Sequence, residues 1–272
     1  MTISALRERF HELHRSGCFV IPNPWDPGSA RALVQLGFPA LATTSSGYAW
    51  SRARPDNGVT LDEALEHFRT IAAGVPVPVN ADFEGGFAIE PEGVAANVTR
   101  AATTGVAGIS IEDSTGDAAE PLFPFELSVE RVRAARRALD AGQTGVVLTG
   151  RSEGFIAGRP DLAETIRRLT AYAEAGADCL YAPGIRSLED IASVVRAVAP
   201  KPVNVLCGSD FATVAGLRDL GVRRVSVGGA LARAAWTGFL EAAREIAERG
   251  TFTQLGRTIP FADINARFQE RP

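Results

Sequence analysis

The chain has 272 residues, of which 46% are hydrophobic and 22% charged, and its formal net charge is −4. This mildly acidic balance, without a basic block, argues against nucleic-acid binding, and no apolar run approaches the roughly 20 residues of a membrane span. The N-terminus lacks the apolar core of a secretion signal, and three scattered cysteines form neither a disulfide framework nor a zinc pattern. We therefore expect a cytoplasmic globular protein with no membrane partner.

Short apolar runs alternate with longer stretches of helical spacing along most of the chain. The runs are rich in Val, Ile, Leu and Ala, as is typical of strands in a parallel sheet that is buried on both faces. The predicted strands lie at 18–23, 40–45, 75–83, 108–113, 145–151, 177–183, 201–207 and 223–229. The predicted helices lie at 27–36, 60–73, 91–104, 128–141, 161–175, 187–198, 211–219 and 230–249.

Eight strands, each followed by a helix, within about 250 residues are the pattern of a (β/α)8 TIM barrel. An open doubly wound sheet is the alternative, but no GxGxxG sequence follows the first strand, where a dinucleotide-binding fold carries it. The sequence therefore predicts an α/β protein of the TIM barrel class.

Polar residues mark several helix starts, and the ends of the chain add further elements. Thr60, Ser128 and Ser187 occupy expected N-cap positions, and Glu63 completes a capping box with Thr60. A helix is expected at about 3–16, and a tail from about 250 is expected to end in a short helix. Because no Pro- or Ser-rich linker divides the chain, residues 1–272 are predicted to form one domain.

In a TIM barrel the catalytic residues lie at the C-terminal ends of the strands. The only lysine, Lys201, begins the seventh strand and falls at the opposite end, which argues against Schiff-base chemistry. The three histidines fall in predicted helices, so a zinc site with imidazole ligands is not expected.

Polar side chains gather at the catalytic strand ends: Thr43, Thr44, Ser45, Ser46, Asn80, Asp82, Glu84, Glu112, Asp113, Arg151, Glu153 and Asn204. Oxygen ligands that converge in this way suit Mg²⁺ or Mn²⁺, with waters completing the octahedron. Asp82, Glu84 and Glu112 are the expected ligands, because burying several like charges without a cation is costly. Asp113 and Glu153 are also explained as helix caps or as partners of an arginine.

Three other features each have two interpretations. Cys207 ends the seventh strand and is either a nucleophile or, as is more common, a small packing residue. Gly228 and Gly229 precede the last helix and either cradle a phosphate or form a tight turn. Residues 114–127 form a long connection that is either a lid or a static surface loop.

Four segments in this order resemble the isocitrate lyase/phosphoenolpyruvate mutase superfamily: IPNPWDPGSARALVQLGFPALATTSSG, ADFEGGF, SIEDS and GRSEGF. The resemblance runs from about Cys18 to about Trp236. It implies a Mg²⁺-dependent barrel that acts on small 2-oxo acids by cleaving or forming C–C or P–C bonds next to an enolate. It also implies a homodimer or homotetramer in which the last helix packs on a neighbouring subunit, whereas the sequence alone equally allows that helix to cover its own barrel.

The resemblance also assigns roles to the substrate side of the site. Ser46, Gly47 and Tyr48 match the segment that holds the carboxylate of a 2-oxo acid. Arg151 matches the arginine that meets the substrate carboxylate or the enolate oxygen. Asn204 lies where relatives have a polar residue on the seventh strand.

On the acidic side, Asp82, Glu84 and Glu112 match the metal-site carboxylates, and Asp56 matches an acidic residue near the metal. One part of the family pattern is missing. The lyases carry a Lys-rich loop with Cys and His after the fourth strand, and the mutases and phosphonopyruvate hydrolases carry a Lys- and Asn-bearing loop there. The sequence STGDAAEPLFPFEL has none of these residues, so only the enolate half of the site is matched.

We therefore expect a Mg²⁺-dependent carbon–carbon lyase or decarboxylase acting on a small 2-oxo or 2-hydroxy carboxylate. The metal, Arg151 and amides near Gly47 are expected to stabilise the enolate, while Asp56, Glu153 and a metal-bound water are candidates for the proton transfer. Two alternatives are a phosphonate P–C mutase or hydrolase and a non-catalytic 2-oxo-acid binding protein. Arg151 has an alternative role too, in which it only neutralises Glu112 or Glu153.

Overall fold

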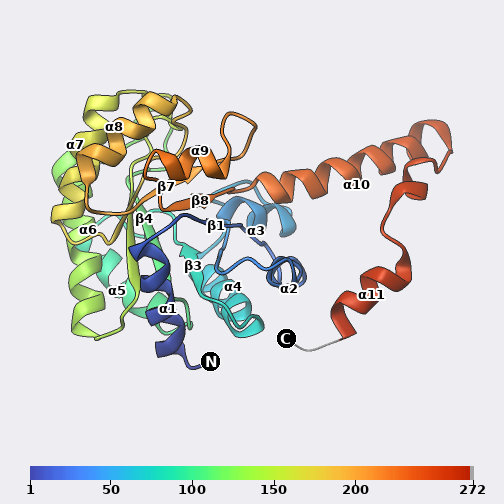
Figure 1. Ribbon diagram of the computed structural model, residues 1–272, viewed down its shortest axis with the longest axis horizontal. Coiled ribbons are helices and arrows are strands. Elements are labelled where there is room, and N and C mark those ends of the chain that lie inside the picture. The colour runs from blue at the N-terminus through green and yellow to red at the C-terminus, as the bar shows by residue number, and fades with distance from the viewer. Residues whose placement is uncertain (270–272) are drawn as a thin grey trace.

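The structure is a computed structural model that describes residues 1–269. Eight parallel strands form one sheet in the order β1-β8-β7-β6-β5-β4-β3-β2, which curls into a nearly closed barrel (Figure 1). A hydrogen bond of 3.1 Å from the Ala42 amide to the Pro22 carbonyl oxygen connects the two ends of this order. The predicted TIM barrel is confirmed.

The strands are β1 (Phe19–Ile21), β2 (Leu41–Ala42), β3 (Val79–Asp82), β4 (Gly108–Glu112), β5 (Val147–Arg151), β6 (Cys179–Tyr181), β7 (Val203–Leu206) and β8 (Arg224–Ser226). The helices up to the last strand are α1 (Ile3–Arg15), α2 (Pro27–Gln35), α3 (Ser45–Ser51), α4 (Leu61–Gly74), α5 (Pro91–Ala102), α6 (Phe125–Ala141), α7 (Leu162–Glu174), α8 (Leu188–Val198) and α9 (Val214–Asp219). After β8 come α10 (Ala230–Arg249), the 3₁₀ helix η1 (Gln254–Arg257) and α11 (Phe261–Gln269).

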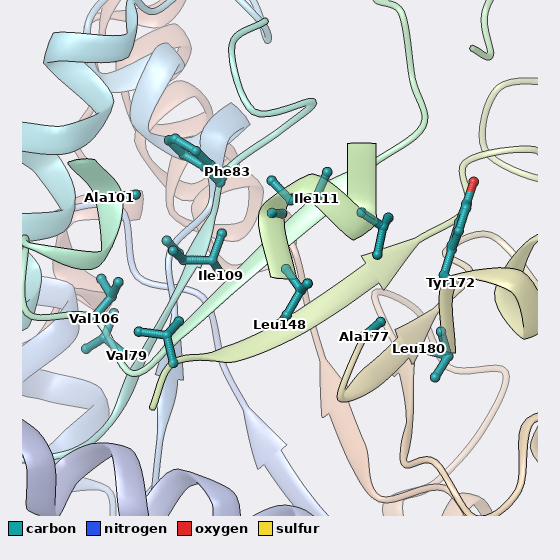
Figure 2. Close-up of a cluster of buried hydrophobic side chains, with 14 of the residues drawn as sticks. Val79, Phe83, Ala101, Val106, Ile109, Ile111, Leu148, Tyr172, Ala177 and Leu180 are labelled. Atoms are coloured by element: carbon teal, nitrogen blue, oxygen red, sulfur yellow. The ribbon is translucent and has the colours of Figure 1, made fainter. Parts of the chain in front are cut away.

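The main hydrophobic core lies between the strands and the surrounding helices. Val79, Ile109 and Leu148 point outwards from their strands and are fully buried against helix residues such as Ala101 and Tyr172 (Figure 2). Burial of one such aliphatic side chain contributes about 1.5–3 kcal/mol to folding. Side chains alternate along a strand, so the residue that directly follows each of these three points into the barrel. On β3, β4 and β5 this inward-pointing residue is polar.

Helix α1 closes the N-terminal end of the barrel. Phe10 is completely buried there with Phe19, Ile21 and Val147. The barrel interior is therefore closed by apolar side chains at its N-terminal end.

Predicted and observed bounds differ by a few residues at several elements, and two differences have a clear cause. The second strand ends at Ala42 instead of residue 45, and the short helix α3, which was not predicted, begins at Ser45, because the Thr44 hydroxyl accepts a hydrogen bond from the Gly47 amide and caps a helical turn. The prediction that Ser128 is an N-cap is wrong: α6 begins at Phe125, and the Ser128 hydroxyl donates to the carbonyl oxygens of Phe123 and Pro124. The caps at Thr60 and Ser187 are confirmed, as is the capping box.

Helix α10 projects away from the barrel, and η1 and α11 turn back towards α2 (Figure 1). Within α10 only Ala232 and Glu245 are buried, so it does not cover its own barrel as an eighth helix. In α11, Arg267 accepts a hydrogen bond from the Gln35 side chain of α2 through its carbonyl oxygen. No helix within residues 1–269 is long and apolar enough to span a bilayer, and the cytoplasmic location stays a prediction.

We expect the chain to be a homodimer or homotetramer, because α10 exposes the large apolar side chains of Trp236, Phe239 and Leu240. Replacing Trp236 and Phe239 together by aspartate should shift the mass measured by light scattering to that of the monomer at micromolar concentration. Leu188→Asp, at an exposed apolar position on the barrel, is the control and should leave the mass unchanged. A monomeric wild type would contradict the prediction.

Candidate active site

A cavity of about 160 Å³ opens at the C-terminal end of the barrel. Hydroxyl and charged groups surround its upper part, namely Thr43, Thr44, Ser45, Ser46, Asp56, Asp82 and Arg151. Further polar side chains from five strands also line it: Asn80, Ser110, Tyr181, Asn204, Arg224 and Ser226. TIM barrels usually fill this space with branched apolar side chains, so a polar interior indicates a binding site.

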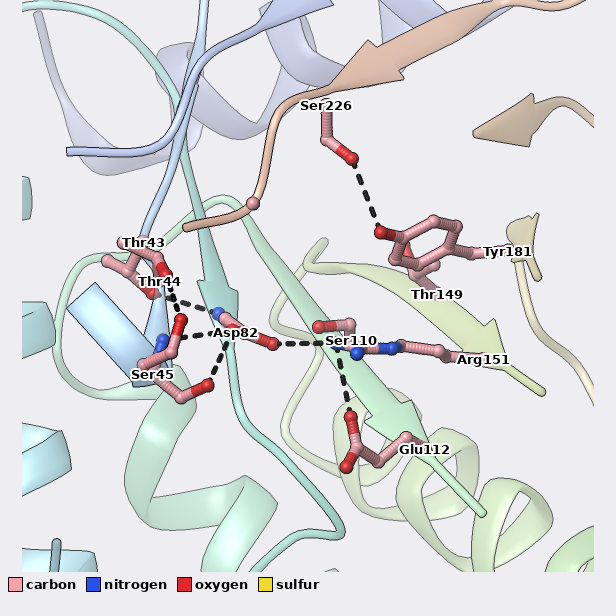
Figure 3. A network of polar contacts seen from close by, with 12 residues as sticks. Thr43, Thr44, Ser45, Asp82, Ser110, Glu112, Thr149, Arg151, Tyr181 and Ser226 are labelled. Carbon is pink, nitrogen blue, oxygen red and sulfur yellow. Dashed lines mark hydrogen bonds and ion pairs between the residues drawn. The ribbon is translucent and has the colours of Figure 1, made fainter. Parts of the chain in front are cut away.

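Arg151, at the end of β5, is the centre of an ionic network (Figure 3). Its Nη1 lies 3.1 Å from both Asp82 Oδ1 and Glu112 Oε2, and its Nε and Nη2 donate to the two carboxylate oxygens of Glu153. The guanidinium carbon also lies 5.2 Å from the centre of the Tyr181 ring. Burial opposes the charged form, but the carboxylates outweigh it and raise the pKa of Arg151 above its ordinary value.

Asp82 is fixed from the opposite side by the segment that follows β2. Its Oδ2 accepts hydrogen bonds of 3.0 Å from both the amide and the hydroxyl of Ser45, and its amide donates to the Thr43 hydroxyl at 2.9 Å (Figure 3). Each oxygen of the carboxylate therefore has a defined direction, one towards α3 and the other towards Arg151.

The neighbouring glutamates carry more negative charge than Arg151 can balance. Burial raises the pKa of Glu112 well above its ordinary value, against the opposing effect of Arg151. Burial, together with Asp82 and Asp56, raises the pKa of Glu84 to about 8. Folding thus holds these acidic groups close enough together that their ionised forms are disfavoured.

Glu84 is held in a strained loop. Its φ is +48°, in the left-handed region that a side chain of this kind rarely adopts, and Phe87 has a φ of +55°. The buried guanidinium of Arg131 donates to the carbonyl oxygens of Gly85, Ala88 and Ile89 and so fixes this loop. Sequence analysis placed Arg131 only as an ordinary helix residue and missed this positioning role.

Asp113 supports the site from behind. It accepts hydrogen bonds from Arg168 at 3.0 Å, from Tyr172 at 2.7 Å and from the Glu153 amide at 2.7 Å. These contacts favour the structural interpretation of Asp113. Glu153, in contrast, pairs directly with Arg151 and belongs to the site.

The acidic groups fit a divalent cation by their chemistry. Asp56, Asp82, Glu84, Glu112 and Glu153 supply hard oxygen donors, and their combined charge exceeds that of the arginine among them. Within the described part of the chain, no three Asp, Glu, His or Cys side chains are already arranged as metal ligands. The Arg151 guanidinium lies between Asp82 and Glu112 and pairs with both of them.

The residues assigned to the substrate divide into two groups. Ser46, Arg151 and Asn204 line the cavity, as does Asp56, the candidate for proton transfer. Gly47 and Tyr48 are not among its lining residues.

Gly47 is buried behind the cavity, where its amide donates to the Thr44 hydroxyl. An added Cβ at this position would lie 2.7 Å from the Thr44 methyl carbon, so a glycine is required. The Tyr48 ring stacks on His67 at a centroid distance of 3.9 Å. These two residues therefore shape α3 and its packing.

The remaining candidates have the following contacts. The Cys207 sulfur faces the carbonyl oxygen of Ser209 at 3.5 Å, which favours the packing interpretation. Gly228 and Gly229 line the cavity, and the Ala230 amide donates to the Val227 carbonyl oxygen at 3.1 Å, as in a tight turn. The 114–127 connection contains a small hairpin with a bridge between Ser114 and Leu122.

Sequence analysis also missed Arg224, Tyr181 and Ser226 in the lower part of the cavity. The signal was present for two of them, because Arg224 and Ser226 are polar at alternate positions of a strand and so share one face of it. Tyr181 is a single aromatic residue in an apolar strand and carries no such pattern.

Comparison with known proteins gives consistent matches. A family model described as phosphoenolpyruvate phosphomutase matches residues 10–247. An uncharacterized protein of Mycobacterium tuberculosis is 34% identical over 260 residues, which are 95% of both chains. An oxaloacetate decarboxylase of Pseudomonas putida is 32% identical over 204 residues, which are 70% of this chain and 67% of the decarboxylase.

Two crystal structures have the same fold. One is of a Burkholderia cenocepacia protein described as a lyase/mutase; it aligns with a TM-score of 0.96 at 48% identity and covers 98% of both chains. The other is of a phosphonopyruvate hydrolase in complex with oxalate and Mg²⁺; it aligns with a TM-score of 0.86 at 26% identity and covers 99% of this chain and 95% of the hydrolase. The matches span the barrel and the residues of its cavity, and the chain therefore belongs to the phosphoenolpyruvate phosphomutase family, within the isocitrate lyase/phosphoenolpyruvate mutase superfamily of enzymes.

Proposed function

We propose that this enzyme is a divalent-metal-dependent lyase or decarboxylase that acts on a small 2-oxo acid and breaks the C–C bond between the carbon next to the carbonyl group and its substituent, so that an enolate is left. The observation that carries the proposal is the environment of Arg151: its guanidinium lines one small cavity with Asp82 and serine hydroxyls, and it also pairs with Glu112, which lines a neighbouring pocket together with Glu84. The oxaloacetate decarboxylase relative and the hydrolase bound to oxalate and Mg²⁺ support it.

Asp82, Glu84 and Glu112 would hold the Mg²⁺ or Mn²⁺ ion. A bound ion of this kind acts as a Lewis acid on carbonyl and carboxylate oxygens. Arg151 contacts Asp82 and Glu112 through Nη1 alone, whereas its Nε and Nη2 are both bonded to Glu153. Nη1 can therefore exchange these two carboxylates for a substrate anion while Glu153 still holds the guanidinium.

The chain's own groups account for the other requirements of the reaction. Ser46 and Arg151 line the cavity where the substrate carboxylate would bind. When the bond between the carbon next to the carbonyl and its substituent breaks, the electron pair moves towards the carbonyl oxygen, and the Arg151 guanidinium is a preorganised donor for the charge that develops there. Surrounding Glu153 and Tyr181 keep the guanidinium in place throughout.

Asp56 is the group best suited to supply the proton to the carbon atom that loses its partner. It lines the mouth of the cavity, and burial together with the charge of Asp82 raises its pKa above the ordinary value. Glu153 is more deeply buried than Asp56, and both of its carboxylate oxygens are bonded to Arg151. A carboxyl group with a raised pKa retains a proton nearer to neutral pH and can act as a general acid.

A P–C bond hydrolase or mutase is the second candidate, and the similarity to phosphonopyruvate hydrolase favours it. With Mg²⁺ we expect the wild type to convert oxaloacetate to pyruvate and not to release phosphate from phosphonopyruvate. Asp82→Asn and a blank with metal alone are the controls for oxaloacetate, which also decarboxylates slowly with metal in solution. Phosphate release would establish the second candidate. Mg²⁺-dependent oxalate binding without turnover of any 2-oxo acid would indicate a binding protein.

A further inference from the structure

A second arginine lies deep in the same cavity and has a different environment from Arg151. Arg224 is on β8, in register with Phe19 of β1, and Phe19 belongs to the apolar cluster that seals the bottom of the barrel. Only 3% of Arg224 is exposed, yet it lines the cavity. Its guanidinium therefore forms part of the cavity floor.

The partners of this guanidinium are all neutral. Nε donates to Asn204 Oδ1 at 2.9 Å, Nη2 donates to the Thr149 hydroxyl at 3.1 Å, and Nη1 lies 3.3 Å from His14 Nε2. His14 Nδ1 bonds to the Phe10 carbonyl oxygen at 2.7 Å and must donate there, which leaves Nε2 as an acceptor. No ion pair among residues 1–269 includes Arg224.

This arrangement leaves both charge and hydrogen-bonding capacity unused. A guanidinium has five N–H groups, and three bonds are made here. A buried cation without an anionic partner is unfavourable. The surrounding groups hold the side chain in one orientation, as a site for an anion requires.

Further donors face the same space. Asn204 donates its amide to Ser226, and the Ser226 hydroxyl approaches the Tyr181 hydroxyl at 3.5 Å (Figure 3). Tyr181 and Ser226 also line the cavity. The chain of bonds Arg224–Asn204–Ser226–Tyr181 thus runs from the floor up to the residue whose ring contacts Arg151.

We infer that the floor around Arg224 is a binding subsite for a small oxyanion, namely a carboxylate or phosphate-type group. Arg224 is the charged donor, and Tyr181, whose hydroxyl oxygen accepts from Ser226, keeps its own O–H as a second donor. The identity of the anion rests on the proposed function. If that function is correct, the anion is the far carboxylate of a dicarboxylic 2-oxo acid whose other end lies at Arg151. A free inorganic anion is the other source of the same chemistry.

Isothermal titration of three ligands tests the inference. Oxalate with Mg²⁺ reports on the upper site, 2-oxoglutarate with Mg²⁺ has a second carboxylate, and inorganic phosphate without metal reports on a free anion. We expect Arg224→Met to weaken the binding of 2-oxoglutarate at least tenfold and to leave that of oxalate within about twofold, as for the loss of a charged hydrogen bond. Arg223→Met is the matched control, because Arg223 bonds to the Gly17 carbonyl oxygen away from the cavity, and it should change neither.

The other outcomes separate the possible failures. Phosphate binding that is lost in Arg224→Met, with 2-oxoglutarate unaffected, supports the subsite and identifies a free anion as its ligand. Equal affinity of wild type and Arg224→Met for all three ligands overturns the inference. Wild type that does not bind oxalate contradicts the proposed function, whereas the phosphate titration still tests the subsite. If Arg224→Met does not fold, Arg224→Lys takes its place, because it keeps the charge. It should still weaken anion binding at least fivefold, since lysine lacks the planar fork. Unchanged binding would again overturn the inference.

Discussion

Replacing Arg151 by lysine is expected to lower the turnover of the 2-oxo acid, or its affinity, by roughly 30- to 1000-fold. This factor corresponds to about 2–4 kcal/mol, which is the usual loss when one oxyanion donor is removed. Lysine keeps the positive charge near Asp82, Glu112 and Glu153 but cannot form the planar fork that now spans them. Metal affinity should therefore remain within about threefold, because the carboxylates keep a compensating cation. Titration with Mg²⁺, followed by titration with oxalate at saturating Mg²⁺, separates the two effects.

Arg136→Lys is a matched control for this experiment. Arg136 has a side chain exposed to 19%, close to the 17% of Arg151, and it pairs with Asp140 and Asp178 outside the cavity. It should change neither titration. If Arg151→Lys instead weakens metal binding and leaves oxalate binding at saturating Mg²⁺ unchanged, then Arg151 only organises the acidic cluster, and the catalytic role proposed for it is wrong.

The fold could be predicted because the apolar runs and the helix caps indicate the same order of strands and helices along the chain. Val79, Ile109 and Leu148 alternate with residues that face the barrel interior, and Thr60 and Ser187 mark helix starts by local bonds alone. At the start of α6, where the predicted N-cap was wrong, contacts between distant segments hold the local structure. Helix α6 begins at Phe125, and Arg168 from α7 binds both Phe123 and Ser128, which are contacts that a local pattern cannot show.

The candidate site could be predicted at the strand ends and not below them. Asp82, Glu112 and Arg151 end their strands, so the barrel rule alone brings them to one rim. Their ion pairs depend on the register between β4 and β5, where Glu112 lies opposite Arg151. Arg224 lies at the start of a strand, and the same rule gives residues at that end of the barrel a role in stability alone. Its access to the cavity depends on small and polar neighbours around the barrel interior.

Removing a metal-site carboxylate is the second change with a large expected effect. Asp82→Asn and Glu112→Gln should each lower Mg²⁺ or Mn²⁺ affinity at least about tenfold, because each removes a charged oxygen ligand from a site that is rich in such ligands. Glu66→Gln, on the exposed face of α4, is the control. Unchanged affinity in both site variants, measured by titration with Mn²⁺, would contradict the assignment of the metal site.

Metal binding should also depend on pH through Glu84, whose pKa of about 8 in the folded, metal-free protein lies above its ordinary value of 4.5. Between pH 4.5 and pH 8 the Glu84 carboxyl keeps its proton in the folded chain and has lost it in the unfolded chain. Glu84 therefore contributes to the free energy of unfolding at low pH, and this contribution is lost as the pH rises towards 8. A cation needs the ionised carboxylate and must displace that proton, so Mg²⁺ affinity should rise about tenfold or more from pH 6.5 to 8. The midpoint of thermal unfolding should therefore fall over this range without metal and recover when Mg²⁺ is added. In Glu84→Gln the proton is absent, so both dependences should become weaker; an unchanged pH dependence of metal affinity in this variant would show that Glu84 is not at the metal site.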